Sequence, residues 1–180
     1  MGFAVEMYFV PEMEKRLCEL RSILAQRGVR PILDELGDTP HISLAIFSQL
    51  EPHMFEPHLR QFARTQPAFP VRLDGVGCFP GVVFLRPEST PSLIKIHSDF
   101  HKVLATLGIT PLEYYKSGKW IPHCTMAQDI GEQAMAHALE TSRQKFPVVE
   151  GMIERIGLVQ FRPVTRLCTF FLSKSTDVTH

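Results

Sequence analysis

Two kinds of hydrophobic pattern alternate along this chain. Apolar residues at positions 3, 5, 7 and 9 predict a strand that ends before Pro11. Leucines three and four residues apart predict a helix over residues 12–26, with Gly28 as its stop. The same reasoning predicts helices over residues 51–65, 91–107 and 132–145, and strands around His41, 71–77, 82–86, around His123, 152–159 and 167–173. The second half of the chain therefore repeats the element order of the first.

One six-residue segment also occurs twice. Residues 40–45 read PHISLA and residues 122–127 read PHCTMA, at an offset of 82 residues. Gly75 and Gly157, and Phe79 and Phe161, are separated by the same offset. This recurrence indicates an internal duplication, with approximate repeats over residues 1–81 and 82–180. Because no Gly/Ser-rich or charged linker divides them, we expect one bilobal domain over residues 1–180.

The repeated segments carry a histidine and a hydroxyl at matching places. Alternate side chains of a strand share a face, so His41 should lie beside Ser43 and His123 beside Thr125, with the residues between them in the core. One imidazole of such a pair can accept a proton while the other donates one. The two hydroxyls can donate hydrogen bonds to an anion. A phosphodiester suits this set of groups, since its transfer needs a base, an acid and stabilised non-bridging oxygens.

The doubled His-x-(Ser/Thr) resembles the two-histidine (2H) phosphoesterases, which include the bacterial 2′-5′ RNA ligase-like proteins. The resemblance implies an α+β fold with two pseudo-twofold-related antiparallel sheets, flanking helices and a central cleft. It implies metal-independent opening of a 2′,3′-cyclic or related nucleotide phosphate, or cleavage of a 2′-5′ RNA linkage, in RNA processing. It also favours His123 as base and His41 as acid. Ser43 stands where threonine is commoner, which keeps the hydroxyl.

Aromatic and basic residues outside the repeated segments are candidates for binding the substrate. The loop over residues 110–121 interleaves aromatic rings with lysines, as a lid over a nucleobase and its phosphate would require. The alternative is that its aromatic residues pack as core, and that the phenylalanines and arginine near the duplicated turns are core and solvent-facing residues. The candidates are Tyr115, Lys119, Trp120, Phe79, Phe161 and Arg162.

Composition limits the partners. Lysine plus arginine and aspartate plus glutamate both number 19, so the formal net charge is zero and does not favour long nucleic acids. We therefore expect a small cyclic nucleotide or a short RNA end as partner, and no DNA. The four cysteines form no close pair, which indicates a reducing compartment. With neither a signal peptide nor a spanning apolar run, we expect a cytoplasmic protein that contacts no membrane. We also expect a monomer, and the family resemblance implies that it needs no cofactor.

Two other functions stay open. The same cleft would suit an RNA-end 2′-5′ ligase or an RNA-binding protein. A metallohydrolase with His41 and His123 as ligands is disfavoured, because no carboxylate or third histidine accompanies either segment in the sequence. His97 and His101 lie four residues apart on a predicted helix, but without the glutamate of a zincin motif we expect them at the solvent-exposed surface.

Overall fold

A computed structural model describes residues 2–161 and 164–174 of the chain. The first half contains β1 (Gly2–Phe9), α1 (Pro11–Gln26), α2 (Ile32–Glu35), β2 (His41–Phe47), α3 (Pro52–Thr65) and β3 (Phe69–Phe79). The second half contains β4 (Val82–Pro87), α4 (Pro91–Leu107), the 3₁₀ turn η1 (Glu113–Tyr115), β5 (Cys124–Ala127), α5 (Glu132–Lys145), β6 (Val149–Phe161) and β7 (Thr165–Phe171). Every predicted helix and strand is present within a few residues of its predicted ends. The sequence did not predict α2 and η1, because each is too short to show a hydrophobic repeat.

The helix ends follow from local chemistry. Pro11, Pro52 and Pro91 each stand at the start of a long helix, where the fixed φ suits the helix and no N–H is needed. Gly108 ends α4 in the left-handed conformation, with φ of 67°. These signals explain why the helix limits were accessible from the sequence.

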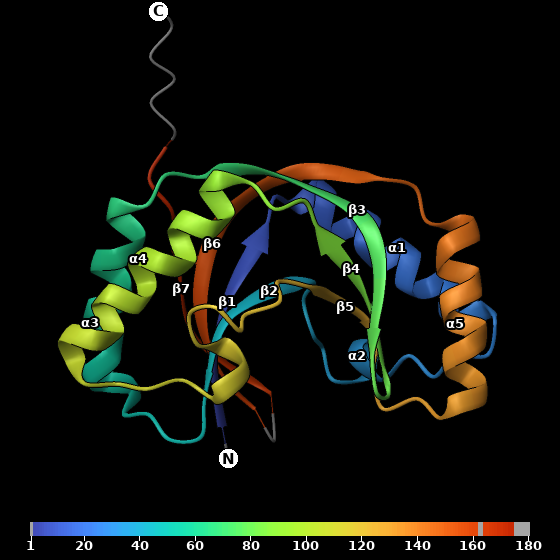
Figure 1. Ribbon diagram of the computed structural model, residues 1–180, viewed down its shortest axis with the longest axis horizontal. Coiled ribbons are helices and arrows are strands. Elements are labelled where there is room, and N and C mark those ends of the chain that lie inside the picture. Colours follow the sequence, from blue (N-terminus) through green and yellow to red (C-terminus); the bar gives the residue numbers. More distant parts are fainter. Residues whose placement is uncertain (1, 162–163, 175–180) are drawn as a thin grey trace, which may run out of the picture.

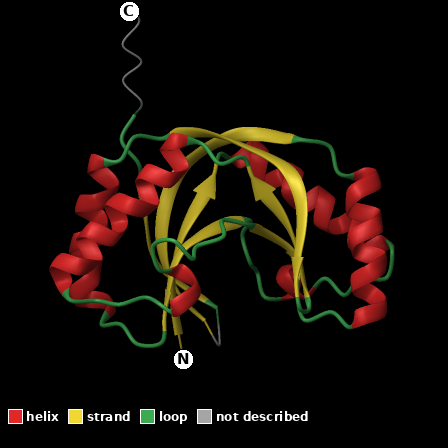
Figure 2. Cartoon of the chain, in the orientation of Figure 1, coloured by secondary structure: helices red, strands yellow, loops and turns green. Residues whose placement is uncertain are grey.

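All strand pairs of the sheet are antiparallel, in the order β2-β1-β6-β3-β4-β5, with β7 also paired to β6. The order is symmetric, since β2-β1-β6 on one side corresponds to β5-β4-β3 on the other. Helices α3 and α4 flank the sheet on one side, and α1 and α5 flank it on the other (Figures 1 and 2). The two antiparallel sheets implied by the resemblance are thus present as two halves, which β3–β6 hydrogen bonds join into one sheet.

The pairing of β3 with β6 at the centre of the sheet follows a twofold symmetry. Phe69 pairs with Ile153, and a shift of both by 82 residues gives the pair Gly151 and Val71, which is also observed. Pro70 and Met152 pair with each other and are themselves 82 residues apart, so the shift exchanges the two members of this pair. The pseudo-twofold axis therefore passes through the Pro70–Met152 pair.

The two histidine strands carry the same irregularity. The β1–β2 register skips Leu44, and the β4–β5 register skips Met126, 82 residues further along. Each bulge lets two successive residues, Leu44 with Ala45 and Met126 with Ala127, face the core. The bulge therefore belongs to the repeated segment.

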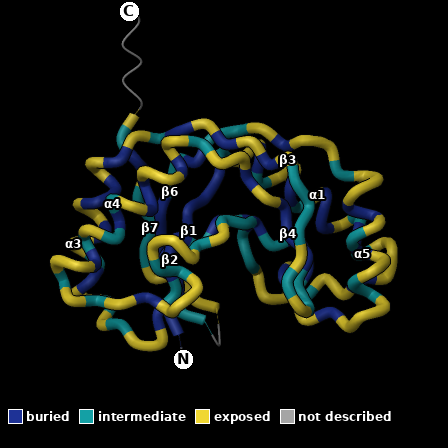
Figure 3. Tube along the Cα trace, viewed as in Figure 1, coloured by how far each residue is buried: buried dark blue, intermediate teal, exposed yellow. Residues whose placement is uncertain are grey.

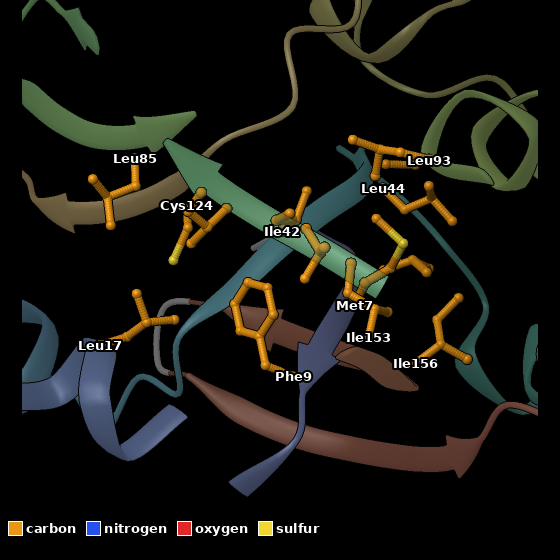
Figure 4. Close-up of a cluster of buried hydrophobic side chains, with 14 of the residues drawn as sticks. Met7, Phe9, Leu17, Ile42, Leu44, Leu85, Leu93, Cys124, Ile153 and Ile156 are labelled. Carbon is orange, nitrogen blue, oxygen red and sulfur yellow. The ribbon is translucent and has the colours of Figure 1, made fainter. Parts of the chain in front are cut away.

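One hydrophobic core joins residues of both halves. Ile42 and Leu44 of β2 lie in the same buried cluster as Cys124 of β5, and Figure 4 shows them among residues of β1, β4 and β6. Strand β1 is buried along its whole length, while the outer faces of the helices are exposed (Figure 3). Among the described residues, no helix combines the length and the apolar character that crossing a membrane requires.

Candidate active site

The histidines and hydroxyls of the repeated segments share one face of their strands, as predicted. His41 and Ser43 are partly exposed, whereas Ile42 between them is buried. His123 and Thr125 are likewise partly exposed around the buried Cys124. The strand alternation therefore separates the polar groups from the core in both halves, and it places the Cys124 thiol away from the site.

Long-range hydrogen bonds hold the two segments together. Arg21 of α1 donates from Nη2 to the Asp38 carboxylate and to the Thr125 carbonyl oxygen, at 2.9 Å each. Its Nη1 donates to the Asp38 carbonyl oxygen at 3.1 Å. On the other side, Trp120 Nε1 donates to the Ser43 carbonyl oxygen at 3.0 Å. Residues 82 positions apart in the sequence thus belong to one locality, where β2 and β5 meet in the centre of Figure 1.

Both imidazoles are anchored in the same way. His41 Nδ1 lies 2.8 Å from the Thr39 carbonyl oxygen, and His123 Nδ1 lies 2.7 Å from the Ile121 carbonyl oxygen. A carbonyl only accepts, so Nδ1 carries the hydrogen in each ring. Each Nε2 is consequently the atom at which a proton can be exchanged.

The surroundings of His41 are acidic. Its Nε2 lies 3.5 Å from the Glu6 carboxylate and its Nδ1 lies 3.4 Å from the Asp38 carboxylate. Burial of the ring opposes protonation, but these carboxylates and the bond to Thr39 outweigh it, so the pKa of His41 is raised. The expectation that no carboxylate accompanies either histidine is wrong, because Glu6 comes from a neighbouring strand and Asp38 from the loop before β2.

The surroundings of His123 are apolar. The rings of Phe79 and Phe84 have their centroids 5.2 and 5.1 Å from that of His123. Burial lowers the pKa of His123, the bond to Ile121 partly opposes this, and the charge of His41 lowers it further. The two duplicated imidazoles thus differ in their proton affinity, so that at a given pH His41 holds a proton to a greater extent and His123 is more often the neutral ring.

A pocket of about 530 Å³ opens beside His123. It brings together four of the predicted substrate-binding residues, and its lining is completed by the β3–β4 turn and the loop before β5. The residues are Phe79, Pro80, Tyr114, Tyr115, Lys119, Trp120, Ile121 and His123. Burial raises the pKa of Tyr115 and the Ser43 hydroxyl opposes that rise, in keeping with the contacts between β2 and η1.

Trp120 forms part of the pocket wall and is supported by packing against His97 of α4. Its ring stacks on His97, with centroids 4.1 Å apart and an interplanar angle of 3°. Contrary to expectation, His97 is buried, and its Nε2 lies 3.1 Å from the Tyr115 carbonyl oxygen. The loop over residues 110–121 covers α4, which the helical pattern of α4 alone did not reveal. Burial lowers the pKa of His97 to about 4, so this ring supports the loop as a neutral group.

Phe161 and Arg162 are the predicted substrate-binding residues that this pocket does not account for. Phe161 packs its ring over the backbone of Gly2, and among the described pockets none has it in its lining. Arg162 lies outside the described residues. Lys119 is at the pocket but is paired with Glu113. Within residues 2–161 and 164–174, no three His, Cys, Asp or Glu side chains are grouped so as to hold a metal ion.

Sequence reasoning missed three polar residues around His41, namely Glu6, Tyr8 and Asp38. Tyr8 donates to Glu6 at 2.7 Å, and Arg166 lies over the Tyr8 ring at 4.9 Å while donating to the Thr39 hydroxyl at 2.6 Å. With Asp38, these residues line a second pocket of about 250 Å³. The one available signal was the polar Glu6 within the apolar run of β1. Asp38 lies only three residues before His41 in the sequence, whereas Tyr8 and Arg166 contribute because distant segments meet.

Comparisons with solved structures agree with the observed fold. The crystal structure of TT0787 of Thermus thermophilus matches with a TM-score of 0.60 at 22% identity, covering 97% of this chain and 100% of that one. E. coli LigT complexed with 3′-AMP matches with a TM-score of 0.60 at 17% identity, covering 96% and 98%. The MHV ns2 PDE domain matches with a TM-score of 0.51 at 18% identity, covering 73% and 80%. These likenesses confirm the expected fold.

The sequence itself identifies the family. No curated protein matches the chain significantly. The family model described as the 2′-5′ RNA ligase superfamily matches residues 11–164, which include both histidine segments. That match supports an enzyme of the two-histidine phosphoesterase kind and confirms the resemblance carried by the repeated segments. The chain belongs to the 2′-5′ RNA ligase superfamily.

Proposed function

We propose that this protein is a metal-independent phosphodiesterase that opens a 2′,3′-cyclic or related nucleotide phosphate, or cleaves a 2′-5′ RNA linkage. The observation that carries the proposal is the pair of identically anchored imidazoles in opposite surroundings. His41 has carboxylates beside it and a raised pKa, whereas His123 has phenylalanines beside it and a lowered pKa. Such a pair supplies a general acid and a general base at the same pH.

In the proposed reaction, each imidazole transfers one proton. His123 Nε2 takes a proton from the attacking water as the water oxygen forms its bond to phosphorus. The bond from phosphorus to the leaving ribose oxygen breaks, and His41 Nε2 gives its proton to that oxygen. Ser43 and Thr125 donate hydrogen bonds to the non-bridging oxygens, where negative charge grows. The product is a ribose phosphomonoester, and solvent returns both histidines to their starting states.

The pocket beside His123 supports a nucleotide as substrate. Tyr115 and Trp120 offer aromatic faces for a base, and Lys119 adds a cation at the rim. Related structures are consistent with this assignment, since E. coli LigT is known in complexes with 3′-AMP and with ATP. The zero net charge favours a small cyclic nucleotide or a short RNA end over long RNA or DNA. We expect the protein to act as a cytoplasmic monomer.

The alternative is a ligase that joins RNA ends through a 2′-5′ bond in the same cleft. The description of the matching family favours it, and the same two histidines serve when their roles are exchanged. Incubation with RNA halves that end in a cyclic phosphate and a 5′-hydroxyl separates the two, because only a ligase gives a longer product. RNA binding without turnover would instead indicate a binding protein.

The test is turnover of 2′,3′-cyclic nucleotides, an ADP-ribose cyclic phosphate and 2′-5′ dinucleotides after dialysis against a chelator. We expect activity to survive the chelator. We expect kcat/KM to fall below a pKa under 6.5, where His123 gains a proton, and above a pKa over 6.5, where His41 loses one.

Variants complete that test. His41→Ala and His123→Ala should each lose most of the rate, and the double variant should be little worse than either. A folded single variant with near wild-type turnover contradicts the proposal. So does activity that is abolished by the chelator and restored by a divalent metal.

A further inference from the structure

Beside the two bulges, a pair of positions that the pseudo-twofold relates holds chemically different residues. Glu6 of β1 pairs with Ser43, immediately beside the bulge in β2. Phe84 of β4 pairs with Thr125, immediately beside the bulge in β5. Glu6 and Phe84 therefore occupy the same place relative to the two histidine segments. One half of the duplication has a carboxylate at this place and the other half has a phenyl ring.

We propose that Glu6 is the positioning residue that makes the duplicated histidines unequal, so that His41 holds the proton to be donated and His123 remains free to accept one. Glu6 acts through His41, whose Nε2 lies 3.5 Å from its Oε1. The catalytic consequence rests on the proposed function, whereas the unequal proton affinities are a property of the free protein.

The carboxylate of Glu6 is held in place although it is buried. Its side chain is 10% exposed, and its Oε2 accepts the hydrogen of the Tyr8 hydroxyl at 2.7 Å. Burial raises the pKa of Tyr8, with a further rise from Glu6, so Tyr8 stays protonated and remains a donor. Burial also raises the pKa of Glu6, while the charge of His41 and the bond from Tyr8 oppose that rise. Glu6 and His41 thus form a coupled pair that stabilises one proton on the imidazole.

Other charged groups near His41 act less directly. Asp38 lies beside Nδ1, which already carries its hydrogen, and its carboxylate is paired with Arg21 at 2.9 Å. The cation of Arg21 offsets that negative charge. Arg166 donates to the Thr39 hydroxyl and covers the face of Tyr8. The titratable and charged groups around His41 are therefore Glu6, Tyr8, Asp38, Arg21, Arg166 and His123. Of these, Glu6 is the group whose carboxylate lies beside His41 Nε2.

Phe84 produces the opposite result at the equivalent place. Its ring is 5% exposed and its centroid lies 5.1 Å from that of His123. A phenyl ring excludes water from the imidazole and supplies no charge to stabilise an imidazolium. The duplication therefore gives two similar catalytic strands, and the neighbouring strand of each half decides which proton role its histidine takes.

The experiment is an NMR titration of the imidazole resonances in the protein without substrate, comparing the wild type with Glu6→Gln. Glutamine keeps the shape of the side chain and an oxygen that accepts from Tyr8, but it removes the charge. We expect the pKa of His41 to fall by about one to three units, with a small change for His123. Glu14→Gln is the matched control, because Glu14 is also a partly buried carboxylate but is paired with Arg155. It should leave both histidine titrations unchanged.

Kinetics of the same variants give the catalytic readout. The alkaline limb of kcat/KM should move to lower pH in Glu6→Gln, with kcat reduced and KM near that of the wild type. At pH values above the alkaline limb of the wild type, the rate should fall about tenfold for each unit by which the pKa of His41 drops. A purely structural role would change stability without moving this limb.

The outcomes separate the two proposals. An unchanged His41 titration in folded Glu6→Gln overturns the role of Glu6, even if the wild type cleaves a cyclic phosphate. A lowered His41 pKa in a protein that turns over no phosphodiester leaves the role intact and refutes the proposed function. If Glu6→Gln does not fold, a carboxyl-carbon titration of the wild type decides. Glu6 should then respond to the titration of His41, and an independent carboxyl with an ordinary pKa contradicts the coupling.

Discussion

Replacing Arg21 by methionine should destabilise the protein through the contacts that join the two histidine segments. Arg21 is 3% exposed, and the Asp38 side chain to which it donates is 13% exposed. Methionine fills a similar volume but leaves the Asp38 carboxylate without its cation at 2.9 Å. It also leaves the Asp38 and Thr125 carbonyl oxygens without the donors at 3.1 and 2.9 Å. The substitution therefore removes one ion pair and two hydrogen bonds in a nearly dry region.

The expected loss in the free energy of unfolding is about 3 kcal/mol. Breaking a buried ion pair by removing one partner costs about 3–5 kcal/mol, and the lower end applies because Asp38 keeps some contact with water. For a chain of this length, that loss corresponds to a decrease in Tm of about 6–12 °C. Arg21→Lys should lose less free energy of unfolding, because lysine keeps the positive charge. It lacks only the planar guanidinium that reaches three acceptors.

Urea denaturation followed by circular dichroism at neutral pH measures the effect. A double-mutant cycle with Asp38→Asn should give a coupling energy of about 0.5–3 kcal/mol, because the two side chains share one interaction. A loss below about 1 kcal/mol in Arg21→Met, or additive single effects, would refute the reasoning. Either result would mean that water replaces the guanidinium at little cost and that Arg21 does not hold the segments together.

Three further outcomes can be measured. Ser43→Ala and Thr125→Val should each lower kcat by about 10- to 1000-fold without a large change in Tm, and unchanged turnover in both would remove the hydroxyls from the site. Trp120→Phe loses the Nε1 donor at 3.0 Å to β2, so KM for a nucleotide should rise about fivefold while kcat is kept; an unaltered KM would make Trp120 a core residue only. Gly157→Ala should destabilise the fold by about 1–3 kcal/mol, since its Cβ would lie 2.8 Å from a backbone oxygen of β7. Gly75→Ala, whose nearest neighbour is a flexible arginine side chain, should cost less, and equal losses would contradict this contact argument.

Much of the fold was accessible from the sequence because its signals are local. The alternation in β1 and the leucine spacing in α1 reflect the periods of strand and helix, and prolines and glycines mark the helix limits. The candidate site was accessible because the chain contains its segment twice. His41 with Ser43 and His123 with Thr125 indicate a matched pair without any knowledge of their surroundings. The repeat also predicted the pseudo-twofold that the β3–β6 register follows.

The chemical difference between the two halves was decided by tertiary structure. The sequence places Glu6 35 positions before His41 and Phe84 39 positions before His123, and no local pattern relates them. Their equivalence appears only when β1 pairs with β2 and β4 pairs with β5. The role of Arg21 and the burial of His97 were missed for the same reason, because Arg21 of α1 contacts Thr125 of β5 and the loop over residues 110–121 covers His97 of α4. The sequence by itself indicated the two imidazoles that we propose as proton carriers. The folded surroundings decided the affinity of each group for its proton, because that affinity depends on charges and solvent within a few ångströms in space.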